Sequence, residues 1–261
     1  MKVEEVLAKI EEVAPLKLSH DFCKNYGLYD NSGIIINCGN AVTGVLFCLD
    51  LTEKAVEKAI SLNYNVIATH HPAIYGGISK FDLTGDPQSR ALAKCMQCGI
   101  SVISMHLNCD SAKYGIDYNL MKGLGGNKCE ILCPLPDGGY GRVYEVEETD
   151  FSSYSKKVAK EFNTDKLLAY GNGSKKVKKV ASFCGAGCDD KAIAFAQNNG
   201  VDVFVSSDMK HHEIIALLGR GINVIVLTHY ASENYGFEKI YLEIKDGLKA
   251  PSSYFTQEEL L

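Results

Sequence analysis

The chain of 261 residues has no tryptophan, no excess of positive charge and no long uncharged apolar run. A membrane-spanning helix needs about 20 consecutive apolar residues, so we expect no membrane span. The formal net charge of −5 provides no basic field for general nucleic-acid binding. The N-terminal residues are charged and lack signal-peptide patterning. We therefore expect a soluble, cytoplasmic protein.

Cysteine is abundant, with 10 residues in the chain. In the expected reducing compartment these cysteines do not predict a disulfide framework. Cys95 and Cys98 form a C-x-x-C sequence, which could be half of a zinc site or a redox motif. They fall in the last turns of an expected helix, whereas a thioredoxin-type motif opens a helix after a strand. We therefore interpret them as small apolar residues of the core.

Strand-like apolar runs alternate with amphipathic helical segments in the first half of the chain. Thr52 is expected to be an N-cap residue, because a helical apolar pattern begins directly after it. The expected elements are a helix over residues 2–13, strands at 34–36 and 45–49, a helix after Thr52, a strand at 66–68, a helix near 87–98 and a strand at 100–104.

The second half repeats this plan. It predicts a strand at 180–183, a tight turn at 185–187, a helix containing Ala192 and Ala196, a strand at 203–205, a helix near 211–218 and a strand at 222–227. At one offset, the residues Ala55, Ala59, Asn65, Val66 and His71 match Ala192, Ala196, Asp202, Val203 and Asp208.

These patterns predict an α/β fold with two similar lobes from a duplicated β-α-β unit. We expect residues 1–125 together with 226–261 to form the first lobe. Residues 126–225, which begin with a segment rich in proline and glycine, should form the second lobe.

Imidazole and carboxylate groups follow three of the expected strands. In open α/β sheets the carboxyl ends of the strands form the functional crevice. Neutral imidazole and carboxylate are also the ligand pair for zinc, iron and manganese. We therefore expect one metal site, with most of its ligands on the first lobe. The candidate ligands are His70, His71, Asp110, His229 and Glu233.

Five ligands exceed the three of a simple catalytic zinc site and suit a dinuclear centre with a carboxylate bridge. Adjacent residues of a strand point in opposite directions. His70 and His71 therefore serve one site only if the chain turns before Pro72; otherwise each imidazole could face a different metal. Capping roles remain the alternative, with Asp110 in an Asx-turn and Glu233 as an ordinary helix charge.

Five short motifs carry a resemblance to a known family. They are residues 29–33, Tyr-Asp-Asn-Ser-Gly; 68–72, Ala-Thr-His-His-Pro; 105–110, Met-His-Leu-Asn-Cys-Asp; 207–212, Ser-Asp-Met-Lys-His-His; and 228–233, Thr-His-Tyr-Ala-Ser-Glu. In this order they resemble the GTP cyclohydrolase I type 2 family, also called NIF-three-like proteins. The resemblance runs from about residue 4 to residue 255.

The resemblance implies a two-lobed NIF-three-like α/β fold with two divalent metal ions per chain, zinc, iron or manganese. It implies the ligand set His70, His71, Asp110, His229 and Glu233, with one or both carboxylates bridging. It also implies a ring-shaped homohexamer with its metal sites facing an internal cavity. Tyr29 replaces the usual Trp of the family, His211 a usual Tyr, and Cys109 a common Leu. None of these departures removes a proposed ligand.

Hydrolysis is the reaction class expected of such a centre. The family name implies ring opening of GTP, in which water adds at C8 of the purine and formate leaves. Our first hypothesis is a metal-dependent hydrolase of a nucleotide-like or other heterocyclic small molecule, with GTP as a candidate. His106 and His212 are candidate proton-transfer groups, or they orient a metal ligand.

Two other functions remain open. The protein could be a non-enzymatic metal-binding scaffold, a metal chaperone or a regulator. It could also be a metal-dependent phosphoesterase, which would need a cation such as Lys210 near the substrate. Lys210 has the alternative of being a plain surface lysine. The Gly185-Ala186-Gly187 sequence is interpreted as a tight turn rather than as a phosphate loop.

Overall fold

The computed structural model describes residues 1–261, which form two compact units. Unit 1 comprises Met1–Ala112 and Phe237–Thr256, and unit 2 comprises Lys113–Gly236 and Gln257–Leu261. The sequence predicted an interrupted first lobe and a continuous second lobe, whereas both units of the structure are interrupted. Residues 113–125, 226–236 and 257–261, expected in the first lobe, lie in unit 2.

Unit 1 contains a five-stranded sheet. Its strands are β1 (Gly33–Ile36), β2 (Val45–Cys48), β3 (Val66–Thr69), β4 (Ser101–Ser104) and β11 (Ser252–Phe255), in the spatial order β1-β4-β3-β2-β11. All neighbouring pairs are parallel except β1 with β4. Its helices are α1 (Val3–Glu11), α2 (Leu16–Tyr26), α3 (Glu53–Ser61), α4 (Pro87–Gln97), α5 (Leu107–Ser111) and the 3-10 turn η1 (Lys245–Gly247).

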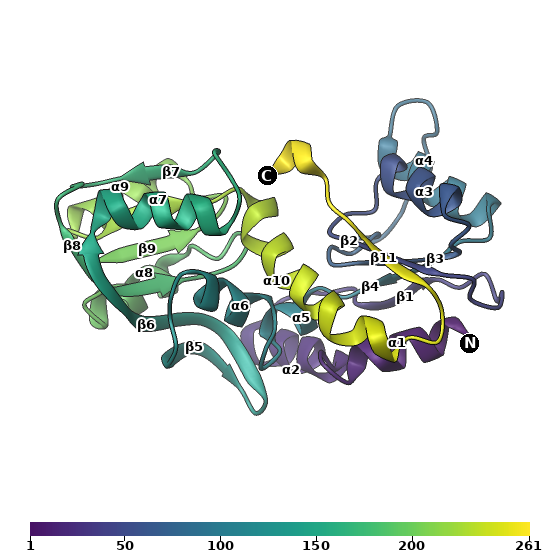
Figure 1. Cartoon of the computed structure of the whole chain (residues 1–261), viewed down its shortest axis with the longest axis horizontal. Coiled ribbons are helices and arrows are strands. Elements are labelled where there is room, and N and C mark those ends of the chain that lie inside the picture. The colour runs from purple at the N-terminus through teal and green to yellow at the C-terminus, as the bar shows by residue number, and fades with distance from the viewer. The chain divides into compact units, whose positions relative to one another are not determined.

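Helices α3 and α4 lie side by side over one face of this sheet (Figure 1). The Thr52 hydroxyl accepts a hydrogen bond from the Ala55 N–H at 3.2 Å, which confirms the expected N-cap. One buried stripe of each helix packs on the sheet because its small apolar residues recur at helical spacing. This core contains Ala55, Val56 and Ala59 from α3, Ala91, Leu92 and Cys95 from α4, and Leu46, Ile67 and Val102 from the strands.

Unit 2 contains a six-stranded sheet. Its strands are β5 (Cys129–Leu135), β6 (Gly138–Asp150), β7 (Leu168–Tyr170), β8 (Lys176–Ser182), β9 (Val203–Ser206) and β10 (Asn223–Val226), in the order β5-β6-β8-β9-β10-β7. Strands β8, β9 and β10 are parallel neighbours, and the other pairs are antiparallel. Its helices are α6 (Ile116–Gly123), α7 (Phe151–Glu161), α8 (Asp190–Asn198), α9 (His211–Gly219) and the 3-10 turn η2 (Glu258–Leu260).

The two units share the expected repeat. The order β2-α3-β3-α4-β4 of unit 1 corresponds to β8-α8-β9-α9-β10 of unit 2, with three adjacent parallel strands in each. The prediction of an α/β fold with two similar lobes is confirmed. Helices α2, α5 and α6 and strands β5, β7 and β11 were not predicted from the sequence.

Helix α10 (His229–Ile244) begins in unit 2 and ends in unit 1. No helix of the structure combines the length and the apolar character needed to cross a membrane.

A buried ion pair joins three segments of unit 2. The side chains of Asp117 and Arg142 are almost fully buried, and Arg142 Nη1 donates to Asp117 Oδ2. The same carboxylate accepts the N–H of Gly141 at 3.0 Å and that of Cys184 at 3.3 Å. Asp117 on α6 thus fixes the start of β6 and the chain that follows β8.

We expect the Asp117→Ala variant to lose about 3–5 kcal/mol of unfolding free energy, because it leaves the Arg142 charge buried without its carboxylate. Denaturant unfolding measures the loss. The Glu148→Gln variant is the control, since it breaks the exposed Glu148–Lys178 pair, and it should show no measurable change. Equal stability of both variants would contradict the role of Asp117.

Candidate metal centre

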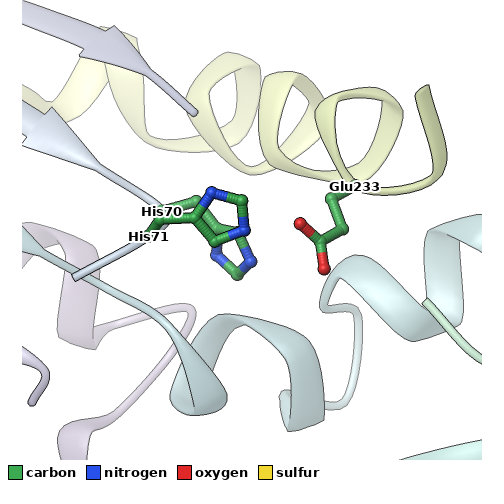
Figure 2. Close-up of side chains that lie close together, drawn as sticks. All are labelled: His70, His71 and Glu233. Atoms are coloured by element: carbon green, nitrogen blue, oxygen red, sulfur yellow. The ribbon is translucent and has the colours of Figure 1, made fainter. Parts of the chain in front are cut away.

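His70 and His71 follow β3 where its regular geometry ends. Both backbone N–H groups donate to the carbonyl oxygen of Leu49, at 3.1 and 2.9 Å. This shared acceptor breaks the alternation of a strand, and the two ring centroids lie only 4.8 Å apart. Figure 2 shows both imidazoles directly after the strand. The chain therefore turns at the point that the sequence argument required.

One ring nitrogen of each histidine is fixed by an oxygen acceptor. His70 Nδ1 lies 2.9 Å from the carbonyl oxygen of Met105, and His71 Nδ1 lies 2.7 Å from Asp50 Oδ1. A carbonyl or carboxylate oxygen can only accept, so Nδ1 carries the proton in both neutral rings. The Nε2 atom of each ring is then the one with a lone pair for a metal.

Asp110 lies on the short helix α5, which follows β4, and its side chain is buried. Asp110 Oδ1 is 3.5 Å from His70 Nε2. His106, at the start of α5, has its ring centroid 5.3 Å from that of His70. Ligand atoms of His70, His106 and Asp110 all lie within 4.8 Å of one another. Unit 1 alone therefore supplies a candidate metal-ligand cluster.

His106 is anchored by the residue 29–33 motif. Its Nδ1 lies 2.9 Å from Asp30 Oδ1, and its backbone N–H donates to the Ser32 hydroxyl. Burial acts to raise the pKa of Asp30, but hydrogen bonds from His106, Ser19 and Ser32 outweigh it and lower the pKa to about 2. Burial acts to lower the pKa of His106, yet the bond to Asp30 and the charge of Asp110 raise it above its usual value.

Unit 2 contributes His229 and Glu233 from the first turns of α10, the helix from which Figure 2 shows Glu233 projecting. His229 Nδ1 lies 2.5 Å from Asp208 Oδ2, and His229 Nε2 lies 3.0 Å from Glu233 Oε2. The spacing of four residues joins them because a helix begins at His229. An oxygen acceptor again fixes Nδ1, and Nε2 faces a carboxylate.

The backbone of Gly185 lies close to the carboxylate of Glu233. Its φ is +58°, and a Cβ atom there would lie 2.3 Å from Glu233 Oε1. Its N–H donates to the Ser232 hydroxyl at 3.2 Å, and its carbonyl accepts the Ser207 N–H at 3.0 Å. The glycine turn is therefore a close contact with Glu233, in agreement with the tight turn that the sequence predicted.

The other candidate residues of unit 2 are exposed. Lys210, His211 and His212 lie at the N-terminus of α9. The Lys210 ammonium is 3.5 Å from Glu213 Oε1, and its backbone N–H donates to the same side chain. No hydrogen bond joins His212 to His229 or Glu233. The structure thus associates His106, but not His212, with predicted ligands of its own unit.

Sequence reasoning missed the acceptors Asp30, Asp50 and Asp208 as functional residues. Asp50 and Asp208 each stand two residues beyond a strand, β2 and β9. They carry the same strand-end signal as the predicted ligands. Asp30 belongs to a motif that the family resemblance included, but no pattern in the sequence pairs it with His106.

Comparisons with known proteins show the family of the chain. The sequence matches the Duf34/NIF3 (NGG1p interacting factor 3) family over residues 1–257. The chain belongs to the Duf34/NIF3 family.

One relative, from Clostridium acetobutylicum, is called GTP cyclohydrolase 1 type 2 homolog. It is 30% identical over 240 residues, covering 89% of this chain and 85% of its own length. NGG1-interacting factor 3 of Saccharomyces cerevisiae is 29% identical over 230 residues, 78% of this chain and 79% of its own. A hypothetical protein of Staphylococcus aureus has the same fold, with a TM-score of 0.83 at 24% identity over 98% and 96% of the two chains.

The ligand clusters make metal binding plausible in this member of the Duf34/NIF3 family. The contact between Gly185 and Glu233 provides a test. In Gly185→Ala the new methyl group must displace the Glu233 carboxylate, so we expect metal affinity to fall about 10–100-fold. Isothermal titration with zinc measures it.

Gly200→Ala is the matched control. Gly200 has a similar φ of +62° with no atom within 4 Å of its Cβ position. It should carry only the strain of a left-handed residue, about 1–2 kcal/mol, with wild-type zinc affinity. Equal affinity of the two variants would show that the glycine turn does not hold Glu233.

Proposed function

We propose that this chain holds two divalent metal ions with His70, His71, Asp110, His229 and Glu233, and that it is a hydrolase of a nucleotide-like small molecule. The proposal includes the homohexamer and the cytoplasmic location expected from the sequence.

The observation that carries the proposal is the fixed Nδ1 atom of all three histidines. Met105 O, Asp50 and Asp208 each accept from one ring. Metal-binding histidines commonly donate their second nitrogen to such an oxygen, which orients the ring and raises the basicity of the ligand. Histidines placed only for packing have no need of this repeated arrangement.

The buried carboxylates support the same conclusion. Asp110 and Glu233 are 5% and 3% exposed. Each faces the Nε2 atom of a histidine whose proton is on Nδ1. A buried carboxylate oxygen facing the Nε2 atom of an imidazole is a pair of donor atoms that a divalent cation can bind together.

Two divalent ions would supply Lewis-acid chemistry and an activated water for hydrolysis near neutral pH. His106 is the protein group best suited to move the proton. Its bond to Asp30 fixes the ring and, with the charge of Asp110, raises its pKa against the effect of burial, and a fixed imidazole can act as a general acid or base. Two relatives are named GTP cyclohydrolase 1 type 2 homolog, and this name supports a purine nucleotide as the substrate.

A second function has one observation in its favour. The yeast relative is named for interaction with NGG1, so a metal-binding scaffold, a metal chaperone or a regulator is the alternative for this chain. The phosphoesterase hypothesis is weaker, because the Lys210 ammonium lies beside Glu213.

Metal content tests the centre. Protein purified without a polyhistidine tag should contain about two metals per chain by elemental analysis, and His71→Ala and Glu233→Gln should each lose most of them. His20→Ala is the control, since the His20 side chain is 77% exposed, and it should keep both metals. One metal per chain that persists in Glu233→Gln would indicate a separate site in unit 1.

A turnover assay distinguishes the hydrolase hypothesis from the scaffold hypothesis. We expect the metal-loaded protein to release formate from GTP, and His106→Ala to lower kcat per bound metal about 10²–10⁴-fold. If wild-type protein with two metals per chain produces neither formate nor another product from a panel of purine nucleotides, the scaffold function is favoured.

A further inference from the structure

A cysteine lies beside the proposed ligands of unit 2. Cys184 Sγ and a carboxylate oxygen of Glu233 lie within 4.8 Å of each other. Cys184 is 2% exposed. Glu233 in turn faces His229 Nε2 at 3.0 Å. Sulfur, carboxylate and imidazole are thus gathered in one unit, from the chain after β8 and from α10.

The backbone at Cys184 is held from both sides. Its N–H donates to Asp117 Oδ1 at 3.3 Å, and its carbonyl accepts the Tyr140 hydroxyl at 2.5 Å. The next residue, Gly185, lies against Glu233, as described above. These hydrogen bonds fix the backbone from which the Cys184 side chain projects, and a fixed backbone helps to position a metal ligand.

The side chain of Phe183, which precedes Cys184, lies in the hydrophobic core of unit 2. Phe183 belongs to the hydrophobic cluster of unit 2 with Val143, Ala181 and Phe204. Its N–H still donates to Val205 O at 3.0 Å, so the chain is extended there. Successive side chains of an extended segment face opposite sides. Phe183 thus fills the core, and Cys184 is directed to the side of Glu233.

We propose that Cys184 is a further metal ligand that binds as a thiolate beside Glu233. This inference rests on the proposed metal centre. On binding, the sulfur–metal bond forms and the thiol proton passes to solvent. A soft thiolate favours zinc, iron or cobalt over manganese. Cys184 would therefore lower the affinity of the site for manganese relative to zinc, iron or cobalt.

Cobalt substitution tests the inference in the wild-type protein. A thiolate bound to Co²⁺ gives an intense near-ultraviolet charge-transfer band, whereas nitrogen and oxygen ligands alone do not. We expect the band in the wild-type protein and in Cys188→Ala, a control four residues away, and its loss in Cys184→Ser. The ratio of zinc to manganese affinity should fall at least about tenfold in Cys184→Ser.

The outcomes separate this inference from the proposed function. Cobalt bound at about two ions per chain without the band would overturn the role of Cys184 and leave the metal centre intact. A band that persists in Cys184→Ser would assign it to another cysteine and overturn the inference as well. No cobalt binding at all would reject both proposals. Because the first readout uses wild-type protein, it does not depend on the folding of a variant.

Discussion

The hydrogen bond from Nδ1 of each proposed histidine ligand to an oxygen acceptor is the interaction on which the candidate centre depends. An imidazole without this bond can rotate and can carry its proton on either nitrogen. With the bond, one orientation and one tautomer are favoured, and Nε2 is left as the ligand atom. The free energy that holds each ring comes from one hydrogen bond. The bonds to the carboxylates of Asp50 and Asp208 are charge-assisted and therefore stronger than a bond between neutral groups.

The parallel sheets explain how these pairs arise. Asp50 follows β2 and His71 follows the adjacent β3, while Asp208 follows β9 and His229 follows the adjacent β10. Neighbouring parallel strands lie about 4.8 Å apart and end at the same edge. An acceptor after one strand is therefore within reach of an imidazole after the next. The repeated β-α-β unit produces this pairing in both units, although at different strands of the repeat.

The parts of this fold that the sequence predicts are those governed by local rules. The N-cap at Thr52, the apolar stripe of α3 and the runs of β3 and β10 all follow from residue spacing. Helix α5 has five residues and no periodic pattern of its own, and β7 has only three. Such short elements exist because the surrounding structure supplies their packing and hydrogen bonds. The link between Asp30 and His106 spans 76 positions, a separation that no local pattern describes.

Local backbone conformation also distinguishes the candidate ligand cluster of unit 2. Asp208 is one of three residues other than glycine with a positive φ, at +50°. The other two, Asn63 and Asn163, are of a residue type that tolerates this region well and follow the ends of α3 and α7. Asp208 instead follows a strand and accepts from His229. Gly185, also left-handed, lies against Glu233. The strained backbone of Asp208 brings an acceptor to His229, and the left-handed turn that glycine permits at position 185 brings backbone against Glu233. Strain kept where it positions an acceptor is the pattern expected of a functional site.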